Sequence, residues 1–241
     1  MPAAPSALLL LIGAAHAWEV NRNADGDPLY WPTGQVEYWV NAENGQDISP
    51  ERLQFLISAA AGAWSKVPDA QLAFSYKGPT TLNAADYTDD KNIVYFEEQW
   101  PAEWDPSFLA LTFTWSVDGG EIIAFDMAIN EDNFDWGVSA NQGDNDLMNM
   151  LTHEMGHAIG LSHSQVEAAT MYYQASNGEE EKRNLTIDDE EGARFLYGGL
   201  LAAAPGCAAA GPRSGGAAGW FAAAAVLSAG ALRRRRPDPA R

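Results

Sequence analysis

Three of the four histidines in this 241-residue chain fall within residues 153–163, which read HEMGHAIGLSH. His153 and His157 are four positions apart, so a helix would place both imidazoles on one face, toward a single ion. Gly160 can leave the helix in a left-handed conformation, and that turn would bring His163 back as a third ligand. Three neutral nitrogens with one open tetrahedral position are typical of catalytic zinc.

Glu154 lies on the neighbouring flank of the same expected helix, close to the ion but outside its ligand set. Zinc lowers the pKa of a bound water toward about 7, and Glu154 is placed to take the proton. The alternative is a polar histidine network on a surface helix. The gathering of three histidines in so short a stretch favours the zinc site, with Glu154 as general base.

These residues need a scaffold, and the pattern of the chain predicts an α+β domain with a twisted, mixed five-stranded sheet and three helices. A Ser-Pro-Glu start favours the first helix, and a capping-box sequence favours the last. The expected strands are 35–41, 72–76, 93–96, 108–117 and 121–130, and the expected helices are 50–67, 147–159 and 187–197.

Charge divides the chain. Residues 18–200 hold 8 basic and 32 acidic side chains, a difference of −24, and the last 41 residues hold six Arg and one Asp, a difference of +5. An acidic body of this size argues strongly against nucleic-acid binding, because it would repel a phosphate backbone. With 46% hydrophobic residues the chain is not disordered as a whole. One cysteine, Cys207, excludes an intramolecular disulfide framework.

The two ends have the composition of targeting segments. Residues 1–17 predict a signal peptide with an A-x-A cleavage site, and residues 18–199 form the expected domain. An Ala/Gly/Pro-rich linker follows at 200–216 with Cys207, then a short transmembrane helix with an Arg cluster at 217–236 and a tail at 237–241. Together these features resemble the myxobacterial-type C-terminal sorting signal; a plain membrane tail is the alternative.

The central motif, HExxHxxGxxH followed by a methionine-containing turn, is the metzincin signature. The chain resembles the matrixins, the matrix-metalloproteinase family, at three places. These are Ser164 after the third histidine, residues 168–172 (AATMY), and residues 184–198, which include the last helix. The resemblance covers about 18–199 and implies a zinc endopeptidase. It also implies that Met171 forms a hydrophobic floor under the zinc, and that substrate pairs with the strand around 108–114. An ordinary core role for Met171 is the alternative.

The chain departs from the matrixin pattern in three ways. No histidine lies between positions 17 and 153, so the family's second, histidine-built zinc site cannot form. No cysteine-switch prodomain precedes the first strand, and Cys207 lies in the wrong place to supply one. Tyr173 stands where the family has proline. In astacins and serralysins a tyrosine at this spacing reaches the zinc, which Tyr173 could do; the alternative is a pocket wall.

Weaker expectations concern the acidic residues. Asp126, Asn130, Glu131 and Asp132 follow a strand where matrixins bind calcium, and they are also compatible with a solvated face. Residues 179–181 are expected to be such a face. Asp188 or Asp189 could pair with the α-amino group that processing would create at Trp18, or could cap the last helix.

The sequence therefore predicts an exported, surface-sorted or extracellular zinc endopeptidase that acts as a monomer on protein or peptide substrates. Its further partner would be the C-terminal sorting machinery of the cell envelope. A catalytically silent surface binding module with the same fold is the main alternative, and a zinc hydrolase with a non-protein substrate is another.

Overall fold

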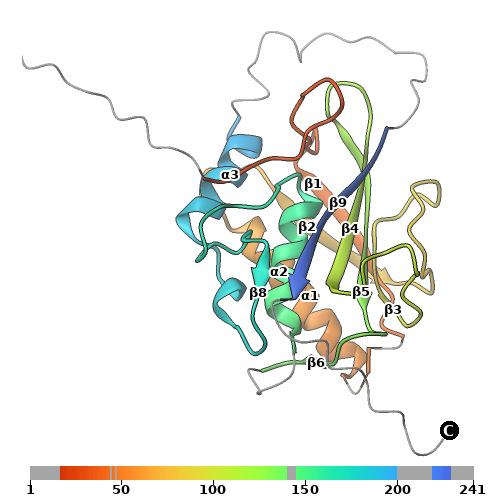
Figure 1. The fold of residues 1–241 in the computed structure, drawn as a ribbon. Coiled ribbons are helices and arrows are strands. Elements are labelled where there is room, and N and C mark those ends of the chain that lie inside the picture. Colours follow the sequence, from red (N-terminus) through yellow and green to blue (C-terminus); the bar gives the residue numbers. More distant parts are fainter. Residues whose placement is uncertain (1–16, 44, 47, 140–144, 200–218, 229–241) are drawn as a thin grey trace, which may run out of the picture.

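The computed structural model describes residues 17–43, 45–46, 48–139, 145–199 and 219–228. Its main sheet has the strand order β2-β1-β3-β5-β4-β9-β8. The first five strands are the expected mixed sheet, in which β1, β2, β3 and β5 are parallel and β4 is antiparallel to β5. Figure 1 shows α1 and α2 lying against this sheet and α3 beyond them. The bounds are β1 Gln35–Val40, β2 Ala73–Pro79, β3 Ile93–Glu97, β4 Phe108–Ser116 and β5 Ile122–Asn130.

The strands form where the sequence alternates or carries long apolar runs. β1 alternates exposed and buried residues, as expected for a strand near the sheet margin. β3 is buried on both faces: Val94 and Phe96 join the core beneath the helices, and Ile93 and Tyr95 join a second cluster on the other face. This double burial explains why the first four residues of β3 are apolar.

Three helices complete the domain: α1 Pro50–Ser65, α2 Leu147–Ala158 and α3 Ile187–Tyr197. The Ser49 side chain caps α1, and the Asp146 side chain accepts a hydrogen bond from the Asn149 N–H at the start of α2. α1 and α2 pack together, and the indole N–H of the fully buried Trp64 donates to the Thr152 carbonyl. This contact fixes α1 against the middle of α2.

Two short elements precede α2 in the chain and two follow it. They are β6 Trp136–Gly137, β7 Asn145–Asp146, β8 Gln174–Ala175 and the 3₁₀ helix η1 Glu181–Arg183. Arg183 of η1 forms an ion pair with Asp146, the residue that caps α2. The segment after α2 is thereby tied back to the start of that helix.

The C-terminal apolar run corrects one expectation. Residues 219–228, expected within a short transmembrane helix at 217–236, form a strand, β9 Gly219–Ser228, that pairs with β4 and β8. Hydropathy alone does not separate a short apolar helix from a strand, and the free edge of β4 offers the backbone partners that decide it. Among the residues that the structure describes, no helix is long and apolar enough to cross a membrane.

The five strands and three helices expected from the sequence are confirmed, with ends that differ by at most a few residues. The remaining expectations for the ends lie outside the described residues. They are the signal peptide up to residue 16, the linker at 200–216 with Cys207, the Arg cluster at 233–236 and the tail at 237–241.

Candidate metal centre

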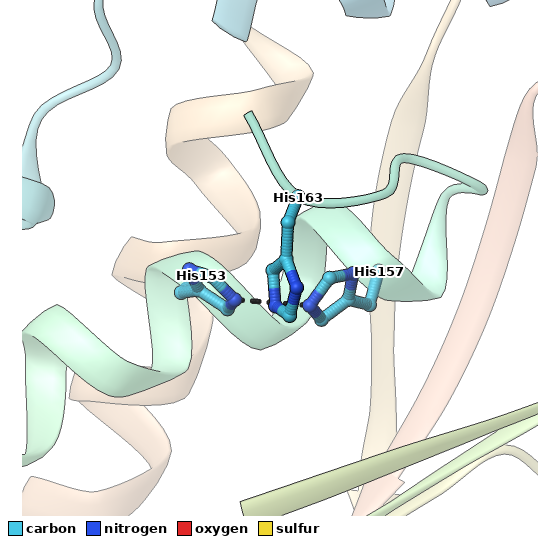
Figure 2. A group of neighbouring side chains, drawn as sticks. All are labelled: His153, His157 and His163. Atoms are coloured by element: carbon cyan, nitrogen blue, oxygen red, sulfur yellow. Dashed lines mark hydrogen bonds between the residues drawn. The ribbon is translucent and has the colours of Figure 1, made fainter. Parts of the chain in front are cut away.

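His153 and His157 lie on one face of α2, and both are buried. Their Nε2 atoms are 2.9 Å apart (Figure 2). Two nitrogens bound to one tetrahedral zinc at about 2.0–2.1 Å would be about 3.3 Å apart, so the observed separation is close to that of a shared ion.

Gly160 turns the chain so that His163 faces the other two histidines. Its φ is +97°, and a Cβ added there would lie 2.2 Å from the Leu29 carbonyl oxygen, so only glycine fits. One ligand atom from each of the three histidines lies within 4.8 Å of the others. The expected third ligand is therefore in place.

The hydrogen bonds of the ring nitrogens indicate that a cation fits among them. His153 Nδ1 lies 2.6 Å from the Thr170 carbonyl oxygen, and His157 Nδ1 lies 2.8 Å from that of Leu161. Because carbonyl oxygens only accept, each Nδ1 carries the proton and each Nε2 presents a lone pair. The Nε2 of His163 is buried without a hydrogen-bond partner in the described structure. Converging buried lone pairs of this kind suit a metal ion.

Burial keeps all three rings in the neutral form that binds metal. Loss of solvation lowers the pKa of His153 well below its usual value, and the neighbouring histidines add to the effect. The same cause lowers the pKa of His157 to about 3 and that of His163 to about 4. The centre can therefore bind a divalent ion at neutral pH without first losing protons.

Glu154 is fully buried between α2 and the sheet. Its Oε2 accepts a 2.5 Å hydrogen bond from the Thr112 hydroxyl of β4, and its Oε1 has no hydrogen-bond partner among the described residues. Burial raises the pKa of Glu154 to about 8, against the lowering effect of the Thr112 hydrogen bond. A carboxyl group with a pKa near neutrality and one free oxygen can both accept and return a proton.

Met171 lies against α2 between the positions of the first two histidines. A Cβ added to Gly156 would lie 2.2 Å from Met171 Sδ and 2.7 Å from a ring carbon of Trp64. Glycine at this position therefore lets the methionine side chain come directly against the helix that carries the ligands. Met171 is 2% exposed. Its role as a hydrophobic floor under a metal ion stays a prediction.

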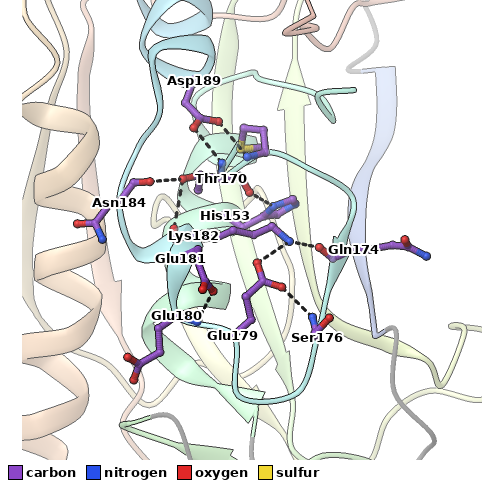
Figure 3. A network of polar contacts seen from close by, with 11 residues as sticks. His153, Thr170, Gln174, Ser176, Glu179, Glu180, Glu181, Lys182, Asn184 and Asp189 are labelled. Atoms are coloured by element: carbon purple, nitrogen blue, oxygen red, sulfur yellow. Dashed lines mark hydrogen bonds and ion pairs between the residues drawn. The ribbon is translucent and has the colours of Figure 1, made fainter. Parts of the chain in front are cut away.

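A polar network from α3 holds the segment that carries Met171 (Figure 3). Asp189 accepts hydrogen bonds from the N–H groups of Thr170 and Met171, each at 2.9 Å. It also takes part in the capping box with Thr186, and Asp188 accepts a 2.6 Å hydrogen bond from the Ser164 hydroxyl. Of the two roles open from the sequence, the structure shows the capping role. Trp18 itself packs on Phe195 of α3.

Lys182 is a buried cation close to His153 and His163. The sequence did not predict this residue as part of the site. Its Nζ donates to the Gln174 carbonyl of β8 and forms a 3.1 Å ion pair with Glu179. The second Glu179 oxygen accepts from the Ser176 N–H. The expected solvated face at 179–181 is therefore wrong for Glu179, whose side chain is 18% exposed and fixes the loop around β8.

Tyr173 lies beside the third histidine, with ring centroids 6.3 Å apart, and is half-buried. It also packs on Tyr172 at 4.6 Å, and a hydrogen bond between the two raises the pKa of Tyr172. The side chain is thus near the centre, as expected from its spacing.

The structure does not gather the expected calcium ligands. Asp126 accepts hydrogen bonds from the N–H groups of Ile93 and Asp86. The Asn130 side-chain oxygen accepts a hydrogen bond from the Asn133 N–H. Glu131 accepts from the Gln46 N–H. Within the described ranges, the only group of three or more potential metal ligands is the histidine trio. Calcium binding stays a prediction that these contacts do not support.

The sequence did not predict three contacts that shape the site. They are the hydrogen bond from Thr112 to Glu154, the contacts of Lys182 with β8 and Glu179, and the hydrogen bonds from the segment at Thr170 to Asp189. Such contacts join residues that are separated in the chain; the Thr112–Glu154 bond, for example, spans 42 positions. Only Thr112, which lies inside the largely apolar strand sequence LALTFTW, carried a local signal, because a polar side chain at a buried position needs a partner.

The fold and the centre define a metallohydrolase domain of the zincin type, with the ligands on one helix and the turn that follows it. The Matrixin family model matches residues 30–198, and the chain belongs to this family. A search of curated proteins found no match. The family and the histidine cluster together indicate a zinc metallopeptidase.

Proposed function

We propose that this protein is an exported zinc endopeptidase that hydrolyses peptide bonds of extracellular proteins. The observation that carries the proposal is the convergence of three buried histidine nitrogens beside a buried, partly unpaired glutamate on the same helix. A structural zinc site would need four protein ligands, and the described residues bring three together.

His153, His157 and His163 would hold the zinc, which supplies Lewis acidity toward water and toward a peptide carbonyl. Glu154 takes a proton from the attacking water through its free Oε1 and then passes it to the leaving amine. Thr112 holds the other carboxylate oxygen, so the free oxygen keeps one orientation. The Thr170 carbonyl fixes the orientation and tautomer of the His153 ring.

Substrate would lie extended along the edge of β4 that faces away from β5, which β9 occupies in the structure. Tyr173 is the residue that we assign to the developing oxyanion, on the basis of its position beside His163. The alternative for Tyr173 is a wall of the substrate pocket. Replacement by phenylalanine separates the two, because only an oxyanion role requires the hydroxyl.

The location of the enzyme is also part of the proposal. The leader at 1–17 and the Arg-containing C-terminal segment support export and recognition by a sorting machinery of the envelope. The excess of acidic side chains in 18–200 agrees with an extracellular enzyme that does not bind nucleic acid. The enzyme would act as a monomer.

The experiment compares wild type with Glu154→Gln, using Glu103→Gln as a matched control at an exposed position. Casein cleavage should fall by about 10³-fold in Glu154→Gln and stay unchanged in the control. Zinc content, measured by atomic absorption, should be one ion per chain in all three. A folded, zinc-loaded wild type that cleaves neither casein nor gelatin would refute the peptidase and favour a binding module.

A further inference from the structure

We propose that the chain's own residues 219–228 dock between the edges of β4 and β8, where an extended peptide substrate would bind, and compete with that substrate. The expected effect on substrate hydrolysis rests on the proposed peptidase function. The docking itself is a separate property that binding can measure without turnover.

The evidence is the position of β9 in the sheet. β9 pairs antiparallel with β4, with Leu111 opposite Ala225 and Phe113 opposite Ala222. It pairs parallel with β8, with Gln174 opposite Leu227. In Figure 1 the dark blue β9 arrow runs between β4 and β8. A segment from the far end of the chain thus lies between two strands that are more than 50 residues apart in the sequence.

The register places this segment opposite Thr112, the partner of Glu154. Thr112, which binds the Glu154 carboxylate, lies between the two β4 residues paired with Ala222 and Ala225. Residues 223 and 224 therefore pass opposite Thr112. β9 also comes within 8 Å of α2, measured between Cα atoms. An extended substrate that added to β4 at this place would need the same backbone partners.

The pairing has the properties of a reversible occupant. Two register shifts interrupt the β4–β9 ladder, so the strands do not form a regular continuous pair. Residues 222–225 are four alanines, a residue type with weak strand preference. Backbone hydrogen bonds rather than intrinsic preference must therefore hold the segment, and a peptide of higher strand propensity can displace it.

Both edges are fixed independently of β9. β4 is paired along its other edge with β5 over seven residue pairs. β8 is held by Lys182, whose ammonium group binds the Gln174 carbonyl and Glu179. Removal of β9 would therefore leave two prepared edges, which is what a binding site for an extended peptide requires.

The test uses the full chain with Ala223→Pro and Ala224→Pro together. Successive N–H groups of a strand point to opposite sides, so one of the two prolines must remove a donor that faces β4. The matched control places two prolines outside the strand, at Ala202 and Ala203. Both variants are also made in the Glu154→Gln background, in which the chain cannot cut its own segment.

The first measurement is the affinity of a fluorescent peptide hydroxamate, whose chelating group binds zinc and whose extended peptide needs the β4 edge. The proline pair in β9 should tighten binding about tenfold, and the control pair should leave it unchanged. Amide hydrogen exchange at Leu111 and Phe113 should become faster only in the β9 variant. Unchanged affinity or unchanged exchange overturns the proposal.

The second measurement is peptide hydrolysis with Glu154 intact. If the segment competes with substrate, the β9 variant lowers KM by the same factor and leaves kcat unchanged. A change in kcat alone contradicts competition. If no variant hydrolyses peptide but the hydroxamate binds more tightly to the β9 variant, the proposed peptidase function fails and the docking of residues 219–228 stands.

Discussion

Replacement of Thr112 by valine tests whether β4 contributes to chemistry as well as to substrate pairing. The change keeps the shape of the side chain and removes the hydroxyl that donates to Glu154 Oε2 at 2.5 Å. Both residues are fully buried, so water does not replace the lost donor. A hydrogen bond to a charged group contributes about 1.5–3 kcal/mol. If that bond orients the carboxylate in the transition state, its loss corresponds to about 10- to 100-fold in kcat.

The assay is steady-state hydrolysis of a quenched-fluorescence peptide by zinc-loaded wild type, Thr112→Val and Thr112→Ser. We expect kcat to fall in Thr112→Val while KM and zinc content stay the same, because the change removes a hydroxyl bonded to Glu154 and leaves the backbone of β4 and the three histidines unaltered. Serine keeps the hydroxyl and should restore most of the rate. Equal loss in the serine and valine variants, or a kcat in Thr112→Val within about twofold of wild type, would refute the reasoning.

Two further predictions concern stability. Burial raises the pKa of Asp126 to about 8, so between its ordinary value and that pKa the folded state holds a proton that the unfolded state has released. The free energy of unfolding should therefore fall as pH rises through this window, by at most about 1.4 kcal/mol per pH unit, and Asp126→Asn should flatten the slope in urea titrations. Equal slopes of the free energy of unfolding against pH in wild type and Asp126→Asn would contradict this. Gly160→Ala should destabilise by about 2 kcal/mol or more, since its Cβ would lie 2.2 Å from the Leu29 carbonyl oxygen. Gly119 has a φ of +84°, and a Cβ added there would have no atom within 4 Å, so Gly119→Ala should lose less stability than Gly160→Ala. Equal losses of stability in thermal melts would show that the close contact at Gly160 is unimportant.

The parts of the site that the sequence predicted are those determined by neighbours in the chain. Helical spacing places His153 and His157, and one glycine in a left-handed conformation, Gly160, turns the chain so that His163 meets them. Cap residues and Gly160 likewise determine where α2 begins and ends. These are local rules, and they hold irrespective of the tertiary structure.

What the sequence could not predict depends on partners distant in the chain. The hydroxyl of Thr112 reaches Glu154 only when β4 packs beside α2. The ammonium group of Lys182 in η1 reaches the Gln174 carbonyl only when η1 packs beside β8. The apolar run at 219–228 is equally compatible with a helix, because its composition leaves the choice to the available partners. Asp126 resembles a calcium ligand in sequence, but two backbone N–H groups engage its oxygens.

The orientation of His153 depends on the last helix, α3. Asp189 binds the Thr170 N–H, and the Thr170 carbonyl binds His153 Nδ1. The Thr170 hydroxyl is held in turn by the carbonyls of Lys182 and Asn184 (Figure 3). Because Asp189 is 1% exposed and its oxygens accept from four groups, its charge is compensated without solvent. Such a fully satisfied buried network has one arrangement of low energy, and it therefore gives the His153 ring one orientation toward the metal.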